Sequence, residues 1–461
     1  MQNGTGDIIS ARIIAVADDG RGIARTDDGF VIFIDKTLPG EKVVAKIYSK
    51  KSKFAEGSLI TVDDKSIART DAVCKYSGVC GGCRWQHISY GEQLNLKQQR
   101  ITDLFERSDL SFPEFSKIIP SPSSLFYRNR LEYFFSDRGW VQKVEENNEW
   151  KPALGFHPAN INNHVIDVDY CFLQSELSNY IRNFIYKYSI ENNLSFYNRK
   201  TNEGLLRNMI IRTTLSEELM IIIIFSEENL QSFNLLKEIS IKFPEITSLL
   251  FATSGSRFVD RYKIDYKLFS GKKYITEKLN NLSFKIGPLS FFQPNAVQAE
   301  NLFKAAIDFA ELNKENIVYD LYCGAGTLSC FAAKRAGKVI GIEYSPEAIS
   351  LANENAELNN SGNVRFFEGD ARNILTPAFV YNNGLADVVV ADPPRAGMSP
   401  FVIHRILRME PKKIIYISCN PSAQVRDLKL FAKKYRITKL QPFDMFPQTA
   451  HIENIAVLEK T

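Results

Sequence analysis

Short apolar runs alternate with polar residues through the first part of the chain, and glycines and prolines separate them. The apolar runs lie at residues 8–9, 11–15, 30–34 and 43–47. Short strands at this spacing, divided by glycine-rich turns, are typical of small closed sheets. We therefore predict an OB-like β-barrel domain over residues 1–61.

The last third of the chain has a more regular pattern, in which predicted strands alternate with predicted helices. The strands are expected at residues 317–321, 339–343, 364–367, 387–391 and 413–418, with helices at 327–335 and 346–359 among them. This alternation predicts a parallel, doubly wound, Rossmann-like α/β sheet, and we assign residues 291–461 to that domain. Such sheets bind ligands beyond the carboxyl ends of their strands, so the residues after each strand are the candidates for a site.

Residues 62–290 mix strands and helices and form a predicted α+β central domain. The domain begins with a cluster of cysteines, which a polar helix at residues 90–107 follows. Its longest apolar run, from Leu219 to Phe225, is far shorter than the roughly 20 residues of a membrane-spanning helix. We expect this run to be a buried strand.

Composition and charge narrow the class of protein only a little. The chain has 461 residues, of which 44% are hydrophobic and 24% are charged, as in globular proteins. Its net charge of +4 allows a nucleic-acid partner without arguing for one. Residues 1–10 lack the basic segment and apolar run of a signal peptide. We expect a cytoplasmic monomer with no membrane partner, in which the seven cysteines are reduced.

The loop after the first strand of the α/β domain carries two glycines, Gly324 and Gly326, in the motif DLYCGAGT (residues 320–327). Glycines at a strand-to-helix turn let a ligand approach the backbone closely. Ser329 occupies the place of the third glycine of a dinucleotide fingerprint, so the match to an NAD site is poor.

An acidic residue follows each of the next three strands. Glu343 is placed to bind ribose hydroxyls, Asp370 suits an adenine edge, and Asp392 begins the motif DPPRAG. Three such residues in succession predict binding of a nucleoside-type cofactor, although a helix N-cap also accounts for Asp370.

A cysteine and a carboxylate complete the set of reactive groups. Cys419, in the motif SCNP, follows a buried strand and precedes a helix, which makes it a candidate nucleophile. Near the C-terminus, the motif FPQTAHIEN supplies Glu453 as a candidate general base. We expect His451 in the same motif to be a structural hydrogen-bonding residue.

The motifs DLYCGAG, DPPRAG, SCNP and FPQTAHIEN together resemble those of the uracil-C5 RNA methyltransferases of the TrmA/RumA type. The resemblance covers nearly the whole chain and implies Cys419 as nucleophile, Glu453 as base and S-adenosyl-L-methionine as methyl donor. It implies donor contacts from Gln293, Tyr322, Thr327, Glu343, Asp370 and Asp392. At position 327 the family often has Asn where this chain has Thr.

The chemistry of that reaction requires these groups. C5 of uracil is a poor nucleophile, and addition of a thiolate to C6 converts C5 into an enolate carbon that can attack a methyl sulfonium. A base then removes the C5 proton and the cysteine is eliminated.

A second group of candidate functional residues consists of the thiols at positions 74, 80, 83 and 171. The spacing of Cys74, Cys80 and Cys83, with Cys171 far along the chain, leaves zinc and iron–sulfur both open. The resemblance to the RumA (RlmD) branch implies a [4Fe–4S] cluster and an RNA-binding TRAM barrel at residues 1–61. Both modules favour 23S rRNA as substrate, although some relatives with both act on tRNA.

Basic and aromatic residues near the cysteines suit an RNA surface that the cluster would shape. They are Lys75, Arg84, Trp85 and residues 127–130. Three alternatives stay open. The protein could catalyse the same reaction on the T-loop uridine of tRNA, it could methylate cytosine, or it could be a non-catalytic RNA-binding or Fe–S protein that retains the methyltransferase fold.

Overall fold

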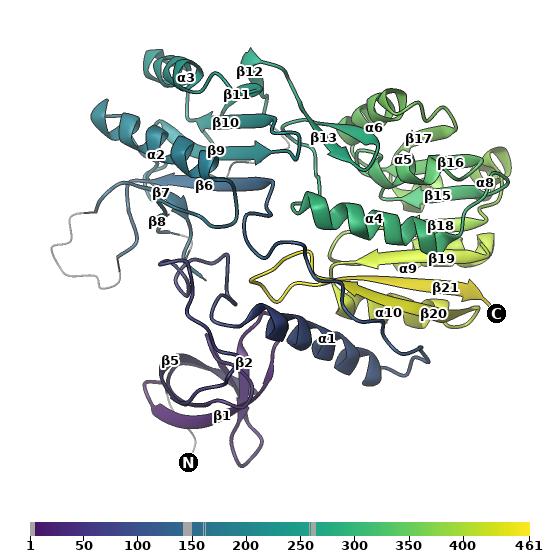
Figure 1. Ribbon diagram of the computed structural model, residues 1–461, viewed down its shortest axis with the longest axis horizontal. Helices are drawn as coiled ribbons and strands as arrows, with labels where there is room; N and C mark the ends of the chain where they lie inside the picture. The colour runs from purple at the N-terminus through teal and green to yellow at the C-terminus, as the bar shows by residue number, and fades with distance from the viewer. Residues whose placement is uncertain (1–4, 142–149, 160, 162, 258, 260–263) are drawn as a thin grey trace.

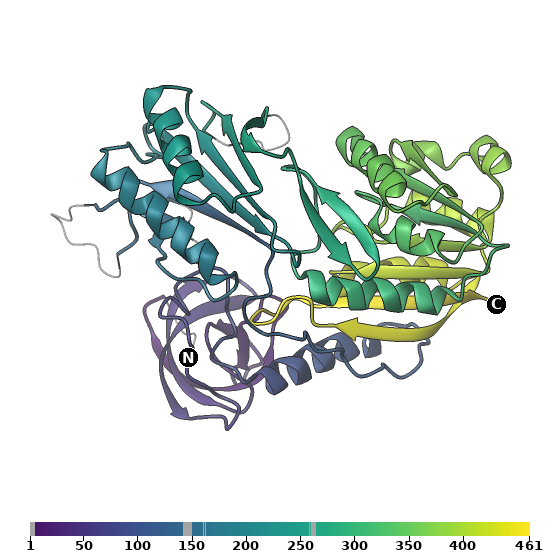
Figure 2. The same ribbon diagram turned by 45° about the horizontal axis from the view of Figure 1, so that its top comes forward.

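The computed structural model describes residues 5–461 except 142–149, 160, 162, 258 and 260–263. The N-terminal part is a closed five-stranded barrel with the strand order β1-β2-β3-β5-β4. Its strands are β1 (Ile8–Val16), β2 (Gly22–Arg25), β3 (Val31–Ile34), β4 (Lys42–Lys50) and β5 (Phe54–Asp64). The barrel lies against the central part of the chain (Figure 2), and the predicted barrel fold is confirmed.

The central part contains a seven-stranded sheet with the order β12-β11-β10-β9-β6-β7-β8. The strands are β6 (Arg130–Ser136), β7 (Ala153–Phe156), β8 (Ile166–Asp167), β9 (Leu206–Thr213), β10 (Leu219–Phe225), β11 (Ser248–Thr253) and β12 (Lys267–Gly271), and the helices are α2 (Glu176–Glu191) and α3 (Leu230–Lys242). Every residue of β10 is buried, which confirms the strand predicted there.

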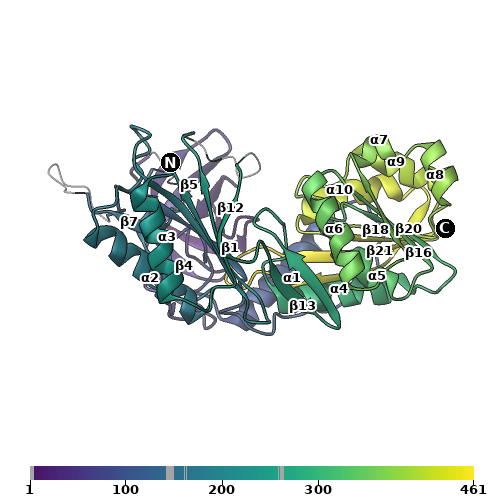
Figure 3. The same cartoon turned by 90° about the horizontal axis from the view of Figure 1, so that it is seen from above.

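Alternate residues of β10 serve two different cores, as the twofold period of a strand requires. Ile221 and Ile223 pack with the apolar residues of α2 and α3. Ile222 faces the other side of the sheet, where it packs with Ile275 and Ile286. Those two residues belong to the hairpin of β13 (Ile275–Leu279) and β14 (Leu282–Ile286), which lies between the central sheet and the C-terminal domain (Figure 3).

Glu277 in β13 is a fully buried carboxylate at this junction. One of its oxygens accepts hydrogen bonds from the N–H groups of Leu215 (2.9 Å) and Lys278 (3.1 Å), and the other has no partner. Burial raises the pKa of Glu277 to about 7, against the lowering effect of the two backbone hydrogen bonds.

The Glu277→Gln substitution is expected to stabilise the protein at pH 8 and to have little effect near pH 4.5. The folded state holds the Glu277 proton more tightly than the unfolded state does, so the wild type loses stability as the pH rises from about 4.5 to about 7, by up to about 3 kcal/mol. Glutamine is neutral throughout. Denaturant titrations of both proteins at several pH values would measure this difference, and a glutamine variant that is less stable at pH 8 would contradict it.

The C-terminal domain is a doubly wound sheet with the order β17-β16-β15-β18-β19-β21-β20, as Figure 1 shows in green and yellow. Its strands are β15 (Ile317–Leu321), β16 (Lys338–Glu343), β17 (Val364–Glu368), β18 (Val388–Ala391), β19 (Lys413–Ser418), β20 (Tyr435–Phe443) and β21 (Glu453–Lys460). Strands β15 to β19 are parallel, and β21 is antiparallel to both of its neighbours. The predicted Rossmann-like sheet is confirmed, and its strand order reverses between β15 and β18.

The helices of this domain are α4 (Ala296–Ala310), α5 (Thr327–Ala333), α6 (Pro346–Leu358), α7 (Ala371–Ile374), α8 (Pro377–Asn383), α9 (Pro400–Met409) and α10 (Pro421–Phe431). An earlier helix, α1 (Tyr90–Glu106), lies along the domain beside α10 (Figure 1). Its Ile101 and Phe105 belong to the same apolar core as Leu428 and Phe431 of α10. Among the described helices, none combines the length and the apolar character needed to cross a membrane.

Candidate active site

The glycine loop after β15 has one glycine that close packing requires and one that faces open space. Gly326, the N-cap of α5, has φ of 78°, and a Cβ atom there would come within 2.8 Å of the Phe366 ring. A Cβ atom at Gly324 would meet nothing within 4 Å. Tyr322 also has a positive φ, 64°, a strained backbone conformation of the kind that occurs at ligand sites.

Glu343 at the end of β16 is tied to this loop by its carboxylate. One oxygen accepts a hydrogen bond from the N–H of Gly324 (3.1 Å), and the other accepts one from the N–H of Ser345 (3.0 Å). The two bonds fix the carboxylate directly beside the glycine turn, and Thr327 begins the helix that leaves this turn.

Asp320, the last but one residue of β15, is a buried carboxylate that the sequence reasoning did not single out. Ser329 donates a hydrogen bond to it at 2.6 Å. Burial raises the pKa of Asp320 to about 7; Ser329 opposes this rise, and the charges of Asp392 and Glu343 add to it. The signal that could have found Asp320 is its place in the motif DLYCGAGT, at the carboxyl end of the first strand.

Asp370 is engaged as a helix cap, the alternative that its sequence position allowed. Its side chain accepts a hydrogen bond from the N–H of Arg372 (2.8 Å) at the start of α7, and it forms an ion pair with the Arg372 guanidinium. The Arg372 side chain lowers the pKa of Asp370. The structure does not place Asp370 with the reactive residues described next.

Cys419, Glu453 and Asp392 come from three neighbouring strand ends and lie within electrostatic reach of one another. The pKa of the Cys419 thiol is raised to about 11, mainly by burial and in part by the charges of Glu453 and Asp392, while Arg395 opposes the rise. Cys419 follows β19, Asp392 follows β18, and Glu453 begins β21. The carboxyl ends of β18 and β19 meet the amino end of β21 because β21 is antiparallel.

Burial raises the pKa of both carboxylates of this group. Burial and then the charge of Asp392 raise the pKa of Glu453 well above its ordinary value, while Arg395 lowers it. Glu453 is 3% exposed, and its Oε2 atom has no hydrogen-bond partner. Burial also raises the pKa of Asp392 to about 7, and a hydrogen bond with the side chain of Gln293 opposes that rise.

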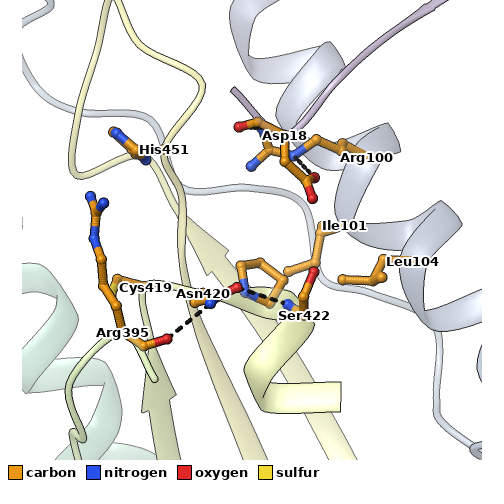
Figure 4. Close-up of a pocket in the computed structure, with 10 residues that line it drawn as sticks. Asp18, Arg100, Ile101, Leu104, Arg395, Cys419, Asn420, Ser422 and His451 are labelled. Atoms are coloured by element: carbon orange, nitrogen blue, oxygen red, sulfur yellow. Dashed lines mark hydrogen bonds and ion pairs between the residues drawn. The ribbon is translucent and has the colours of Figure 1, made fainter. Parts of the chain in front are cut away.

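Cys419 lies in the wall of a pocket of about 180 Å³. Figure 4 shows Arg395, His451 and Cys419 on one side of it and Asp18 and Arg100 on the other. Asp18 belongs to the turn between β1 and β2 of the barrel, and Arg100 to α1, so the N-terminal barrel reaches the pocket. Arg100 approaches Asp18 at 3.7 Å. No motif pointed to this pair, because neither residue belongs to a recognisable pattern.

His451 lines the pocket and does not form the structural hydrogen bond that we expected. Within the described part of the chain its ring has no hydrogen-bond partner, and its neighbour is the ring of Phe446 at 6.0 Å. The pKa of His451 is lowered to about 4, mainly by desolvation and in part by surrounding cations, Arg395 first among them. The imidazole is therefore neutral at pH 7.

Helix α1 anchors the loop that carries His451 through buried polar contacts. Lys97 and Asp444, both fully buried, form an ion pair at 2.5 Å, and Lys97 also donates to the carbonyl of Phe446 (3.0 Å). Gln93 and Gln448 exchange two further hydrogen bonds, of 3.0 and 2.9 Å. Helix α1 thus fixes the segment that leads into Glu453.

The Lys97→Met substitution is expected to lower the free energy of unfolding by about 3–5 kcal/mol, because it leaves the Asp444 carboxylate buried without a counter-ion. Urea denaturation would measure the loss. The double variant Lys97→Met/Asp444→Asn is expected to recover part of it, since the buried charge is then absent as well. A single variant as stable as the wild type would contradict this account of the loop.

The four thiols predicted as metal ligands lie near one another, although they come from two distant segments. All are free thiols. The pKa of Cys83 is raised to about 12, mainly by burial and in part by the other three thiols of the set. Among the described residues, no three His, Cys, Asp or Glu side chains are close enough together to hold a single metal ion.

Trp85 does not belong to an exposed RNA surface as the sequence suggested. Its side chain is fully buried, and its Nε1–H donates to the carbonyl of Gly20 in the barrel (2.9 Å). The N–H of Trp85 donates to the carbonyl of Gln448 (3.0 Å). Trp85 therefore joins the barrel, the cysteine loop and the segment before Glu453.

Comparison with known proteins agrees with the arrangement of these motifs. A family model for tRNA (uracil-5-)-methyltransferases matches residues 89–461. The chain belongs to this family. A TRAM domain model matches residues 4–60, which identifies the barrel. As members of this family are RNA (uracil-5-)-methyltransferases, the protein is an S-adenosylmethionine-dependent RNA methyltransferase, as the motifs predicted.

Relatives of similar length support the assignment. An RNA methyltransferase of Bacteroides thetaiotaomicron is 42% identical over 453 residues, which are 96% of this chain and 100% of the relative. One of Porphyromonas gingivalis is 39% identical over 459 residues, covering 97% and 98%. The crystal structure of the Pyrococcus abyssi tRNA (uracil-54, C5)-methyltransferase in complex with S-adenosyl-L-homocysteine is 28% identical, with a TM-score of 0.79 and coverage of 98% and 100%.

Proposed function

We propose that the enzyme methylates C5 of a uridine through a covalent adduct between Cys419 and C6 of the base. The observation that carries the proposal is the convergence of the Cys419 thiol with the buried carboxylate of Glu453, whose Oε2 is free to accept a proton. A nucleophile next to a positioned base is the arrangement that addition and elimination require.

Each step of this reaction is assigned to a group of the chain. The Cys419 thiolate forms a bond with C6, and the electrons of the C5–C6 double bond move to C5. C5 takes the methyl group of S-adenosylmethionine, whose S–CH₃ bond breaks to leave S-adenosylhomocysteine. Glu453 accepts the C5 proton, the double bond re-forms, and the C6–S bond breaks to return the thiolate. Arg395, which lowers the pKa of both Cys419 and Glu453, favours the charged forms that the first and third steps use.

S-adenosylmethionine is proposed to bind along the carboxyl edge of the sheet. The supporting observations are the open glycine turn and the fixed carboxylate of Glu343 beside it. The residues proposed to contact it are Gln293, Tyr322, Gly324, Gly326, Thr327, Glu343, Asp370 and Asp392. We propose that residues 1–61 bind RNA, that residues 62–290 contain the thiol cluster and that residues 291–461 carry out methyl transfer.

For the RNA, we propose 23S rRNA as the substrate, on the strength of the TRAM barrel together with the four-thiol cluster. A second candidate is the T-loop uridine of tRNA. The observation that favours it is the full-length similarity to the Pyrococcus abyssi tRNA (uracil-54, C5)-methyltransferase, which covers the barrel as well as the catalytic domain.

We also propose that Cys74, Cys80, Cys83 and Cys171 hold a [4Fe–4S] cluster. Four free thiols that influence one another electrostatically are the ligand set of such a cluster, and a four-iron group needs its ligands farther apart than a single ion does. The cluster would link the loop that contains Trp85 to the Cys171 segment. Iron and sulfide analysis tests this, and Cys171→Ser is expected to lose iron or solubility; a variant that keeps both would refute the cluster.

Methyl transfer from labelled S-adenosylmethionine, with unmodified 23S rRNA and unmodified tRNA side by side, tests the function. Anaerobically purified protein is expected to produce 5-methyluridine in the rRNA. Label in tRNA alone would keep the mechanism and replace the substrate. No label in either RNA would favour a non-catalytic RNA-binding protein, and 5-methylcytidine would identify a cytosine enzyme.

A further inference from the structure

A short segment, residues 126–129, connects the reactive pocket with the surface around Cys171. On one side, the Tyr127 hydroxyl donates to the carbonyl of Pro447 (3.0 Å) and the Asn129 side chain donates to the carbonyl of Gln293 (2.9 Å). On the other side, the N–H of Phe126 donates to the carbonyl of Phe172 (2.7 Å). The segment therefore links the loop that carries His451 to the residues beside Cys171.

Arg128, in the middle of this segment, is a cation whose side chain has no acidic partner among the described residues. Its Nε–H is buried without an acceptor, although guanidinium groups at such positions normally find one. Desolvation is the main cause of the lowered pKa of His451, and Arg128 is one of the cations that add to it. The N–H of Arg128 donates to the carbonyl of Leu173 (2.8 Å), two residues after Cys171. Arg128 therefore lies between the pocket and the Cys171 segment, and a phosphate group would supply its missing acceptor.

Next to Arg128, three aromatic residues form an aromatic shelf, which consists of Phe126, Tyr170 and Phe172. The ring of Phe172 lies 6.1 Å from that of Phe126 and 4.7 Å from that of Tyr170. Phe126 is 47% exposed and has φ of 53°. A bulky side chain in the left-handed region is uncommon, and an exposed one held there by a backbone hydrogen bond marks a strained position of functional interest.

A cavity of about 390 Å³ lies beside the shelf. Its lining residues are Val73, Lys75, Asp169, Tyr170, Phe172 and Asn183. Lys75 and Asp169 form an ion pair at 2.6 Å, but their side chains are 65% and 51% exposed. Such exposed pairs contribute little free energy, so Lys75 is able to exchange the carboxylate for a phosphate at small cost.

We propose that the aromatic shelf and Arg128 form a second nucleotide-binding site, which takes an unpaired nucleotide that flanks the target uridine. The base stacks on the exposed ring of Phe126, which is the ring of the shelf most open to solvent, and the backbone phosphate pairs with Arg128. The occupant is unpaired because only a base released from a helix offers its face to aromatic side chains. The proposal rests on the proposed function in that the occupant is part of the same RNA substrate.

RNA binding tests the site without relying on turnover. We would place 2-aminopurine at each position that flanks the uridine in a short unpaired RNA and titrate it with the enzyme. Quenching at one flanking position is expected with wild type. The Phe126→Asn variant, in which Asn tolerates the positive φ, is expected to bind about tenfold more weakly and to lose the quenching. Phe126→Tyr is expected to restore both.

The Arg128→Gln variant is expected to lower the slope of log affinity against log salt by about one, as for loss of one phosphate contact. Matched controls are Tyr381→Ala on α8, where the side chain is 89% exposed, and Arg107→Gln at the end of α1, where it is 80% exposed. Neither control should change RNA binding, and all variants should bind S-adenosylmethionine as wild type does.

If wild type quenches no flanking position, or if Phe126→Asn and Arg128→Gln bind RNA like their controls, the second site is refuted. This failure is distinct from failure of the proposed function, which would appear as the absence of methyl transfer from wild type that still binds the RNA.

Discussion

Replacing Cys419 with alanine is expected to reduce methyl transfer by on the order of 10⁴-fold or more. Without the thiol no adduct forms at C6, and C5 keeps the low nucleophilicity of free uracil. Binding of S-adenosylmethionine should persist, because the glycine turn and Glu343 lie at other strand ends. Single-turnover transfer of labelled methyl, together with calorimetric binding of the donor, would separate the two effects.

Cys330→Ala is the matched control for this prediction. Cys330 lies in α5, is fully buried in an apolar core and does not line the reactive pocket. The same change of thiol to methyl there should leave the rate nearly intact. A Cys419→Ala protein that methylates like this control would show that the nucleophile is another group.

RNA that carries 5-fluorouridine provides an independent measure of the same step. Fluorine does not leave C5 as a proton does, so the C6 thioether should persist and migrate with the protein on a denaturing gel. Wild type is expected to form this species and Cys419→Ala to lack it. If wild type forms no adduct while it still methylates ordinary RNA, covalent catalysis by Cys419 is wrong.

Local patterns were sufficient to predict the elements that depend on local sequence. The barrel, the buried strand β10 and the parallel strands of the C-terminal sheet follow from apolar periodicity and turn residues. The helix predicted to reach Arg335 ends at Ala333 instead, a shift of the size usual at helix ends. The motifs also indicated which strand ends carry Glu343, Asp392 and Cys419.

The parts that the sequence did not predict are contacts between distant segments. Asp18 and Arg100 reach the pocket because the barrel and α1 lie against the C-terminal domain, and no local pattern encodes that docking. Trp85 looked like a nucleic-acid contact because aromatic and basic residues surround it in sequence, yet its indole N–H is satisfied by Gly20. The role of Lys97 in fixing the loop before Glu453 likewise depends on Asp444, far along the chain.

Docking of the barrel at the pocket has a consequence for substrate recognition. The β1–β2 turn is held by Trp85 at Gly20 and by Arg100 at the carbonyl of Asp18, 3.3 Å away. In the proposed function, RNA bound by the barrel would therefore be held at a fixed position relative to Cys419. Because a positioned substrate reacts much faster than one that must find the site, we expect the barrel to contribute to orientation as well as to affinity.

Replacing Glu453 with glutamine is expected to convert the enzyme into one that accumulates its own intermediate on ordinary uridine. Glutamine cannot accept the C5 proton, so elimination stops after methyl transfer and turnover falls by about 10²–10⁴-fold. Burial is the main cause of the raised pKa of Cys419, and the charge of Glu453 adds to it. A neutral side chain at position 453 therefore makes the thiolate easier to form, and addition to C6 should not be impaired.

The intermediate would be detected as a protein–RNA species on a denaturing gel that contains the labelled methyl group. Glu459→Gln, a half-buried position near the opposite end of the same strand β21, is the matched control and should turn over like the wild type. A Glu453→Gln protein that turns over normally would place the base elsewhere, with Asp392 as the next candidate. One that forms neither adduct nor product would mean that Glu453 acts before methyl transfer, by taking the proton of the Cys419 thiol, and that Asp392 does not replace it in this role.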